Sequence, residues 1–254
     1  MALFDLKGRV ALVTGASSGL GSRFARVLAD QGADVIVVAR RLERLEQLAK
    51  EIESKGARCL ALKCDATVEA EVVDTVKKAI SHFGKIDILV NNAGIALGGN
   101  AENVSLDDFK KVMDVNINGV FTFAREVGKN MIDNRYGRII NVASMYGMVG
   151  NKFSAALSYH SSKGAVINFA RGLAAEWAKY NITVNNIGPG FFDSEMTGDF
   201  INSNAFTNFV KNMTCLERAG RPEELDTALV FLAADGSSYI TGQTIFVDGG
   251  WTAI

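Results

Sequence analysis

Short apolar runs alternate with amphipathic stretches along the chain. The runs are uniformly rich in valine, isoleucine and leucine, a pattern that favours strands covered on both faces. The stretches between them show helical spacing; in residues 41–56, leucines at positions 42, 45 and 48 precede a terminal glycine. The predicted strands span residues 9–15, 34–40, 57–64, 86–94, 137–144, 182–190 and 244–250.

Seven strands with helices between them predict an α/β fold with a doubly wound, seven-stranded parallel sheet of the Rossmann type. The chain has 254 residues and only two prolines, and no linker rich in serine, glycine or proline divides it. We therefore expect a single domain over residues 1–254.

Composition narrows the possible classes of protein. Hydrophobic residues make up 48% of the chain and the net charge is −1, with the basic residues scattered, so no nucleic-acid partner is expected. No apolar run is long enough to span a membrane. The N-terminus contains Asp5 and no long apolar block, so no signal peptide is expected. Three cysteines without a CxxC pattern indicate free cytoplasmic thiols, and two histidines predict no metal site.

A glycine-rich stretch, TGASSGLG (14–21), directly follows the first predicted strand and precedes a helical pattern. Glycines at 15, 19 and 21 permit a tight turn and a close approach of backbone N–H groups to a pyrophosphate. Many glycines only turn the chain, but strand, loop and helix stand here in the order of a dinucleotide-binding βαβ unit. A dinucleotide cofactor is therefore predicted.

The end of the second predicted strand carries two cations where NAD sites commonly place an acid. The sequence there is Ala39, Arg40 and Arg41, while Asp34 stands at the wrong end of the strand. A guanidinium binds a 2′-phosphate bidentately, although both arginines could simply decorate the next helix. We predict NADP(H) as the preferred cofactor, with NAD(H) possible and Arg40 as the main contact.

Tyr159 and Lys163 stand four positions apart in a helical pattern, so they share one helix face. A nearby ammonium is expected to lower the pKa of the phenol, which would make the tyrosine an effective acid and base. Each residue alone could equally be a half-buried aromatic or a solvated charge. His160 points about 100° away on the helix and is interpreted as structural.

Several motifs together resemble those of the short-chain dehydrogenase/reductase superfamily, most closely its gluconate 5-dehydrogenase and 3-oxoacyl reductase types. The resemblance covers nearly the whole chain. It rests on TGxxxGxG (14–21), NNAG (91–94), the N-x-x-G pair Asn116 and Gly119, Ser144, the Y-x-x-x-K signature at Tyr159, IGPGFF (187–192) and ITGQTIFVDGG (240–250).

The resemblance implies a catalytic set of Asn116, Ser144, Tyr159 and Lys163. Tyr159 would exchange a proton with the substrate oxygen, which Ser144 would hold. Lys163 would also bind the nicotinamide ribose, and Asn116 would support a water chain from Lys163 to solvent. The substrate contacts implied are Ser144, Met145 and Tyr159.

The same resemblance implies a set of cofactor contacts. Asp65 would contact the adenine, although it could equally cap the next helix. Ser194 stands where a threonine is usual and keeps a hydroxyl for the nicotinamide carboxamide. The full set is Gly15, Ser17, Ser18, Gly19, Leu20, Gly21, Arg40, Arg41, Asp65, Ala66, Asn92, Ala93, Gly94, Tyr159, Lys163, Pro189, Gly190, Phe192 and Ser194.

The spacing from Ser144 to Tyr159 departs from the superfamily pattern. It is 15 positions, longer than is most common, so the loop 145–157 should alter the pocket wall near Met145 and Tyr146. A substrate-covering segment is expected at about 191–220. There Lys211, Arg218 and Arg221 could bind a carboxylate or be surface charges.

The substrate implied by the resemblance is a sugar acid or keto-sugar, interconverted between a secondary alcohol and a ketone. Alternatives are a 3-oxoacyl reductase of the fatty-acid type, a hydroxysteroid dehydrogenase, or a dinucleotide-binding regulator without turnover. The resemblance also implies a homotetramer in which helices around 106–133 and 157–179 pack between subunits.

Overall fold

Seven parallel strands form one sheet in the computed structural model, which describes residues 3–152, 155–193 and 203–254. Their order is β3-β2-β1-β4-β5-β6-β7. The predicted doubly wound parallel sheet is confirmed, and each strand lies inside its predicted range. The strands are β1 (Val10–Thr14), β2 (Asp34–Ala39), β3 (Cys59–Lys63), β4 (Ile88–Asn91), β5 (Gly137–Val142), β6 (Ile182–Pro189) and β7 (Thr244–Val247).

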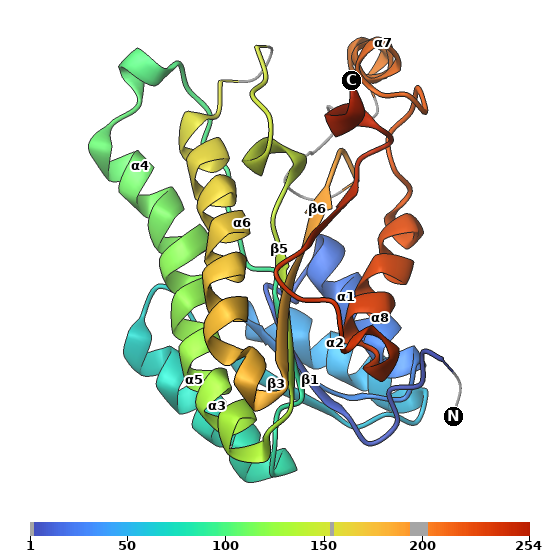
Figure 1. The fold of residues 1–254 in the computed structure, drawn as a ribbon. Helices are drawn as coiled ribbons and strands as arrows, with labels where there is room; N and C mark the ends of the chain where they lie inside the picture. The colour runs from blue at the N-terminus through green and yellow to red at the C-terminus, as the bar shows by residue number, and fades with distance from the viewer. Residues whose placement is uncertain (1–2, 153–154, 194–202) are drawn as a thin grey trace.

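Helices cover both faces of the sheet (Figure 1). One face carries α1 (Gly19–Asp30), α2 (Leu42–Ser54) and α8 (Asp226–Ala233), and the other carries α3 (Glu69–Phe83), α5 (Gly119–Asn134) and α6 (Leu157–Trp177). The remaining two described α-helices are α4 (Leu106–Met113) and α7 (Asn204–Met213). None of the helices in the described ranges is long and apolar enough to cross a membrane.

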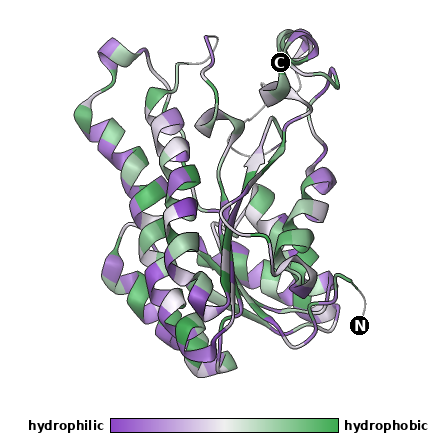
Figure 2. Ribbon diagram, in the orientation of Figure 1, coloured by the Kyte–Doolittle hydropathy of each residue, from purple (hydrophilic) through white to green (hydrophobic). Residues whose placement is uncertain are grey.

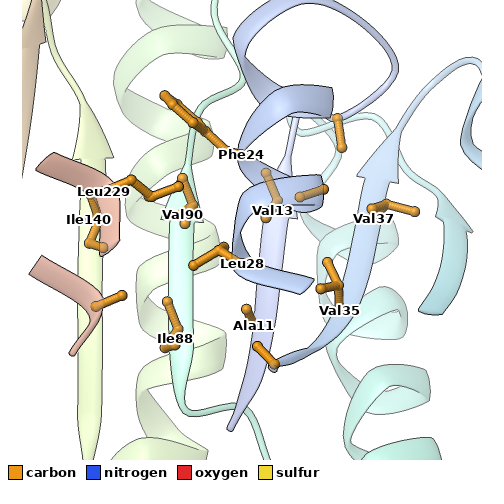
Figure 3. Packing of buried hydrophobic residues seen from close by; sticks show 14 of the residues in the cluster. Ala11, Val13, Phe24, Leu28, Val35, Val37, Ile88, Val90, Ile140 and Leu229 are labelled. Atoms are coloured by element: carbon orange, nitrogen blue, oxygen red, sulfur yellow. The ribbon is translucent and has the colours of Figure 1, made fainter. Parts of the chain in front are cut away.

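The core consists of two apolar layers, one on each side of the sheet. On the first side, Phe24 and Leu28 of α1 and Leu229 of α8 pack over strand residues such as Val13 and Val90 (Figure 3). The helices carry hydrophilic and hydrophobic residues in alternation along their length (Figure 2), as expected when one side faces the sheet and the other faces solvent. Burial on both faces accounts for the uniform apolar runs of the strands.

A row of buried amides joins four neighbouring strands near their carboxyl ends. Asn91 Nδ2 donates to Asn141 Oδ1 at 3.0 Å, and Asn141 Nδ2 donates to Asn186 Oδ1 at 3.1 Å. Asn186 Nδ2 then donates to Thr244 Oγ1 at 3.0 Å. Because Asn141 and Asn186 each accept from one neighbour and donate to the next, the row fixes the relative height of β4, β5, β6 and β7. The loops that follow these strands therefore start from one level edge.

The crevice at this edge lies between β1 and β4, where the strand order reverses. The chain leaves β1 toward one face of the sheet and leaves β4 toward the other, which opens a gap between the two loops. Helix α7 and the C-terminal residues lie beyond the same end of the sheet (Figure 1). The predicted functional motifs follow β1, β4, β5 and β6, so the fold gathers them at this crevice.

Candidate active site

Residues 14–21 form a tight loop that leads from β1 into the first turn of α1. Gly15 and Gly19 have φ angles of +66° and +52°, a region that favours glycine. A Cβ on Gly21 would lie 2.3 Å from the Gly15 carbonyl oxygen and 2.4 Å from Asn92 Nδ2. Only glycine permits this close packing of α1 on the loop, which presents the amides of the helix start at the crevice.

A hydrogen-bonded clamp connects this loop to the end of β4. Thr14 Oγ1 accepts from the backbone N–H groups of Asn92 and Ala93, both at 3.0 Å. Asn92 Nδ2 donates to the carbonyl oxygens of Thr14 at 3.0 Å and Gly15 at 3.3 Å. The sequence analysis assigned Asn92 and Ala93 but gave Thr14 no role, although Thr14 opens the quoted motif. The clamp holds the two walls of the crevice together.

The two arginines after β2 have different surroundings. Arg41 donates from Nε and Nη2 to Ser17 Oγ at 3.1 and 3.0 Å, and from Nη2 to Ser18 Oγ at 2.8 Å. Arg40 instead lies close enough to Asp65 for its charge to help lower the pKa of that carboxyl. Thus Arg41, rather than the Arg40 favoured from the sequence, lies against the glycine-rich loop 14–21. Arg41 is the N-cap residue of α2, and this position at the helix start brings its guanidinium next to the loop.

Asp65 forms a turn before α3 but does not cap this helix, whose N-cap is Val68 without a side-chain cap bond, so the capping interpretation is wrong. Its Oδ1 accepts from the Thr67 N–H at 3.0 Å and from Thr67 Oγ1 at 2.8 Å. The bond from the Thr67 backbone is the main reason that the pKa of Asp65 is lowered. Asp34 pairs with Arg58 across β2 and β3 and is remote from the crevice, as expected.

The catalytic side chains predicted from the sequence converge beyond β5. Ser144 caps a short 3₁₀ turn, where its Oγ accepts from the Tyr146 N–H at 3.2 Å. Tyr159 lies in the first turn of α6, where Ser144 is close enough to the phenol to act on its pKa. Lys163 lies one turn further along, and its Nζ is 5.6 Å from the centre of the Tyr159 ring. The serine, the phenol and the ammonium group thus occupy one corner of the crevice.

The pKa values of this corner differ from the sequence expectation. Burial raises the pKa of Tyr159 to about 12, and the hydrogen bond with Ser144 opposes this rise only in part. The Lys163 ammonium donates to the Val142 carbonyl at 2.6 Å, and burial lowers its pKa to about 8. The expectation that Lys163 lowers the pKa of the phenol is therefore wrong, because burial sets the direction of the shift and Lys163 is not among the groups that oppose it.

Asn116 lies in a π-helical turn between α4 and α5 and is fully buried. Its Oδ1 accepts from the Ile95 N–H at 2.8 Å, and its Nδ2 donates to the Ile95 carbonyl at 2.9 Å and to Ser162 Oγ at 3.0 Å. A Cβ on Gly94 would lie 3.4 Å from Asn116 Oδ1 and 3.5 Å from Lys163 Nζ. Asn116 and Lys163 thus both lie next to the backbone at Gly94. The sequence analysis predicted neither the π-helical turn nor the contact with Ser162.

The side of the corner that the sequence analysis expects to face a substrate is lined by aromatic rings. Met145, expected to contact substrate, is 2% exposed, whereas the Tyr146 ring lies edge-on to Tyr159 with centres 6.5 Å apart. Trp251, near the C-terminus, lies 6.3 Å from Tyr146 and 5.6 Å from Phe191 between ring centres. Trp251 was not assigned from the sequence, although it directly follows the quoted motif at 240–250. The cluster comprises Tyr146, Phe191, Phe206, Phe209 and Trp251.

The segment after β6 contributes its backbone more than its side chains. Phe192 is 4% exposed and its ring packs over Gly220, where a Cβ would lie 2.3 Å from the ring. A Cβ on Gly190 would lie 2.7 Å from the Asp248 Cα, so this glycine allows a close backbone crossing. Ser194 and the rest of residues 194–202 within the expected substrate-covering segment lie outside the described residues.

Two of the three basic residues considered for a carboxylate site are paired with glutamates, and the third is exposed. Arg218 donates to both carboxylate oxygens of Glu224 at 2.7 Å. Arg221 pairs with Glu224 at 3.1 Å and with Glu223 at 3.3 Å. Lys211 lies exposed on α7. The alternative that these are surface charges agrees better with the structure.

A nucleotide crevice beside a serine, tyrosine and lysine on a parallel sheet defines a short-chain dehydrogenase/reductase. A family model described as an enoyl-(acyl carrier protein) reductase matches residues 15–252. The chain belongs to the short-chain dehydrogenase/reductase family and is an oxidoreductase. This confirms the family to which the sequence motifs pointed.

Particular relatives share the full length of the chain. It is 36% identical over 250 residues to the 2-dehydro-3-deoxy-D-gluconate 5-dehydrogenase of Formosa agariphila, covering 98% of this chain and 94% of the relative. It is 40% identical over 248 residues to a 3-oxoacyl-(acyl-carrier-protein) reductase of Rickettsia conorii, covering 98% of each. The structure of a Burkholderia cenocepacia gluconate 5-dehydrogenase in complex with NADP and tartrate matches with a TM-score of 0.95 and 35% identity, covering 99% of this chain and 98% of that one.

Proposed function

We propose that the chain interconverts a secondary alcohol and a ketone with a nicotinamide cofactor, using Tyr159 as the acid and base. The observation that carries this proposal is the convergence of three groups: the buried Lys163 Nζ lies 5.6 Å from the centre of the Tyr159 ring, and Ser144 lies close enough to the phenol to lower its pKa. With a pKa of about 12 the phenol is protonated at neutral pH, as a proton donor must be. This suits donation to a carbonyl oxygen during reduction.

The residues around the crevice fit a dinucleotide. Gly21 lets α1 pack closely on the loop after β1, so the N-terminus of this helix is held at the loop where a phosphate would bind. A nicotinamide cofactor would supply or accept the hydride. Ser144 would hold the substrate oxygen, Tyr159 would give it a proton, and Lys163 would bind the ribose and position the phenol. Asn116 would link Lys163 to the Ile95 backbone and thus to the start of a proton path.

The cofactor is proposed to be NADP(H) in preference to NAD(H). Supporting this, Arg41 and the hydroxyls of Ser17 and Ser18 already form one polar group beside the loop. The similar Burkholderia enzyme is described in complex with NADP. A phosphate between Arg40 and Arg41 would receive charge-assisted hydrogen bonds, which NADH cannot accept.

Replacing Arg41 is expected to weaken the preference for NADPH. Arg41→Ala should raise KM for NADPH at least about tenfold and leave KM for NADH nearly unchanged, since a hydrogen bond to a charged group contributes about 1.5–3 kcal/mol. Arg40→Ala, the matched comparison, should have a smaller effect. Steady-state kinetics with both cofactors measures this. Equal kcat/KM values for NADPH and NADH in the unmodified enzyme would contradict the proposed preference.

The substrate is proposed to be a sugar acid or keto-sugar. The Formosa relative is named for a deoxy-gluconate, and the Burkholderia structure contains tartrate, a hydroxylated acid. The second candidate is a 3-oxoacyl thioester, which the similarity to the Rickettsia enzyme favours. A regulator without turnover is disfavoured because it would need no assembled serine, tyrosine and lysine.

A panel of ketones offered with NADPH tests the substrate proposal. The expected result is a higher kcat/KM for polyhydroxylated keto acids, such as 5-keto-D-gluconate, than for acetoacetyl thioesters or steroid ketones. A preference for the thioester would support the second candidate. Inactivity toward every carbonyl compound would support a regulator.

Assembly as a homotetramer in the cytoplasm is part of the same proposal. Leu106 at the start of α4 and Phe121 on α5 are 66% and 46% exposed, apolar surface that a second subunit would cover. The cysteines of the described chain are free thiols, as is usual in a reducing compartment. Sedimentation as a monomer at micromolar concentration would refute the tetramer, and fractionation outside the cytoplasm would refute the location.

A further inference from the structure

A cavity of about 720 Å³ lies between the loop after β4 and the loop from β5 into α6. Residues 99–102 form one wall, and residues 146–152 with the start of α6 form the other. The two loops are tied where the Gly99 N–H donates to the Ala155 carbonyl at 2.8 Å. None of the residues assigned above to cofactor binding or catalysis lines this cavity, so it adjoins the crevice without being part of it.

Tyr146 is the wall that the cavity shares with the active-site corner. Its ring lines the cavity and also lies edge-on to Tyr159, with an interplanar angle of 89°. Its hydroxyl is hydrogen-bonded to Asn151, another lining residue. A ligand whose reacting carbon lies at Tyr159 therefore enters the cavity when it extends past Tyr146. The loop that places Tyr146 here is the one with the long spacing between Ser144 and Tyr159.

His160 lies behind Tyr146 and has an unmet hydrogen-bonding capacity. Its ring stacks on Tyr146 with centres 4.5 Å apart and planes 20° apart. Its Nδ1 is 2.8 Å from the Ala156 carbonyl. A carbonyl only accepts, so Nδ1 carries the proton and Nε2 is left as an acceptor. Nε2 is buried without a hydrogen-bond partner among the described residues, a state that costs free energy until a donor reaches it.

We propose that this cavity is a distal subsite for the hydroxylated end of the substrate, with His160 Nε2 accepting a hydrogen bond from a substrate hydroxyl. The proposal deepens the proposed function and rests on it. Reaching Nε2 requires the half-buried Tyr146 ring to slide along the imidazole. Asn100, Glu102 and Asn151 add polar groups to the lining. A hydrocarbon chain would offer none of them a partner, so the cavity discriminates in favour of a polyol.

The first test removes the acceptor while keeping a flat ring against Tyr146. In His160→Phe, kcat/KM with NADPH is compared for 5-keto-D-gluconate and for a hydroxyl-free ketone of similar length. We expect a loss of roughly tenfold or more for the hydroxylated substrate, mainly through KM, and less than about threefold for the other. His82→Phe, at the end of α3, is the matched control and should change neither value.

The second test fills the cavity from its exposed side. Met148 is 62% exposed and lines the cavity, so Met148→Trp should fold normally and raise KM selectively for the hydroxylated ketone. Equal losses for both ketones, or none, in the two variants would overturn the subsite and assign His160 a structural role. Inactivity of the unmodified enzyme toward every polyhydroxylated ketone would instead overturn the proposed function, and the subsite with it.

Discussion

Tyr159→Phe is expected to lower kcat by about 10³-fold or more while leaving cofactor affinity within a few-fold of the original value. The substitution removes one oxygen and keeps the ring that packs against Tyr146. General acid catalysis by a positioned side chain typically contributes 10²–10⁴-fold, and the proposed function assigns this proton transfer to the phenol. Steady-state rates and fluorescence titration with NADPH measure the two quantities.

A matched control for this result is Tyr239→Phe. Tyr239 is fully exposed and lies after α8, remote from the crevice, so its hydroxyl should not affect turnover. Retention of more than a tenth of the activity in Tyr159→Phe would show that another group donates the proton. A large loss of NADPH affinity in the same variant would show instead that the phenol mainly supports the cofactor.

The sheet could be predicted from the sequence because its strands are buried on both faces. A run such as Val10–Thr14 is entirely buried, so every position in it had to be small or apolar. The amide row of Asn91, Asn141 and Asn186 could not be predicted in the same way. Each asparagine by itself reads as a polar residue near a strand end, and only the parallel register brings the three side chains together.

The proximity of Tyr159 and Lys163 could be predicted because residues four positions apart in a helix share one face. Contacts between distant segments had no such signal: Tyr146 and Trp251 are more than a hundred positions apart, yet their rings meet beside the active-site corner. Similarly, the spacing of Tyr159 and Lys163 cannot show how strongly each is desolvated. Burial therefore reversed the expected direction of the phenol's pKa.

Lys163→Met is expected to abolish most activity and yet to stabilise the cofactor-free protein at pH 7. Lys163 is 4% exposed, and burial lowers its pKa to about 8. At about 1.4 kcal/mol for each pKa unit, burying the charge costs roughly 3 kcal/mol at pH 7. Methionine has a similar length and no charge. The Val142 carbonyl then loses its donor, at a cost of about 1 kcal/mol, so a net gain of about 1–2 kcal/mol remains.

The pH dependence separates this explanation from better apolar packing. The folded pKa of Lys163 lies below its unfolded value, so the unfolded chain binds more protons between about pH 8 and 10.5, and the unmodified protein gains stability as pH rises through that window. The advantage of Lys163→Met should therefore shrink by pH 10 in urea unfolding. Lys110→Met, on the exposed side of α4, should change stability by less than about 0.5 kcal/mol. If the Lys163→Met protein is instead less stable at pH 7, the hydrogen bonds and contacts of the buried ammonium stabilise the folded chain by more than the burial of its charge costs.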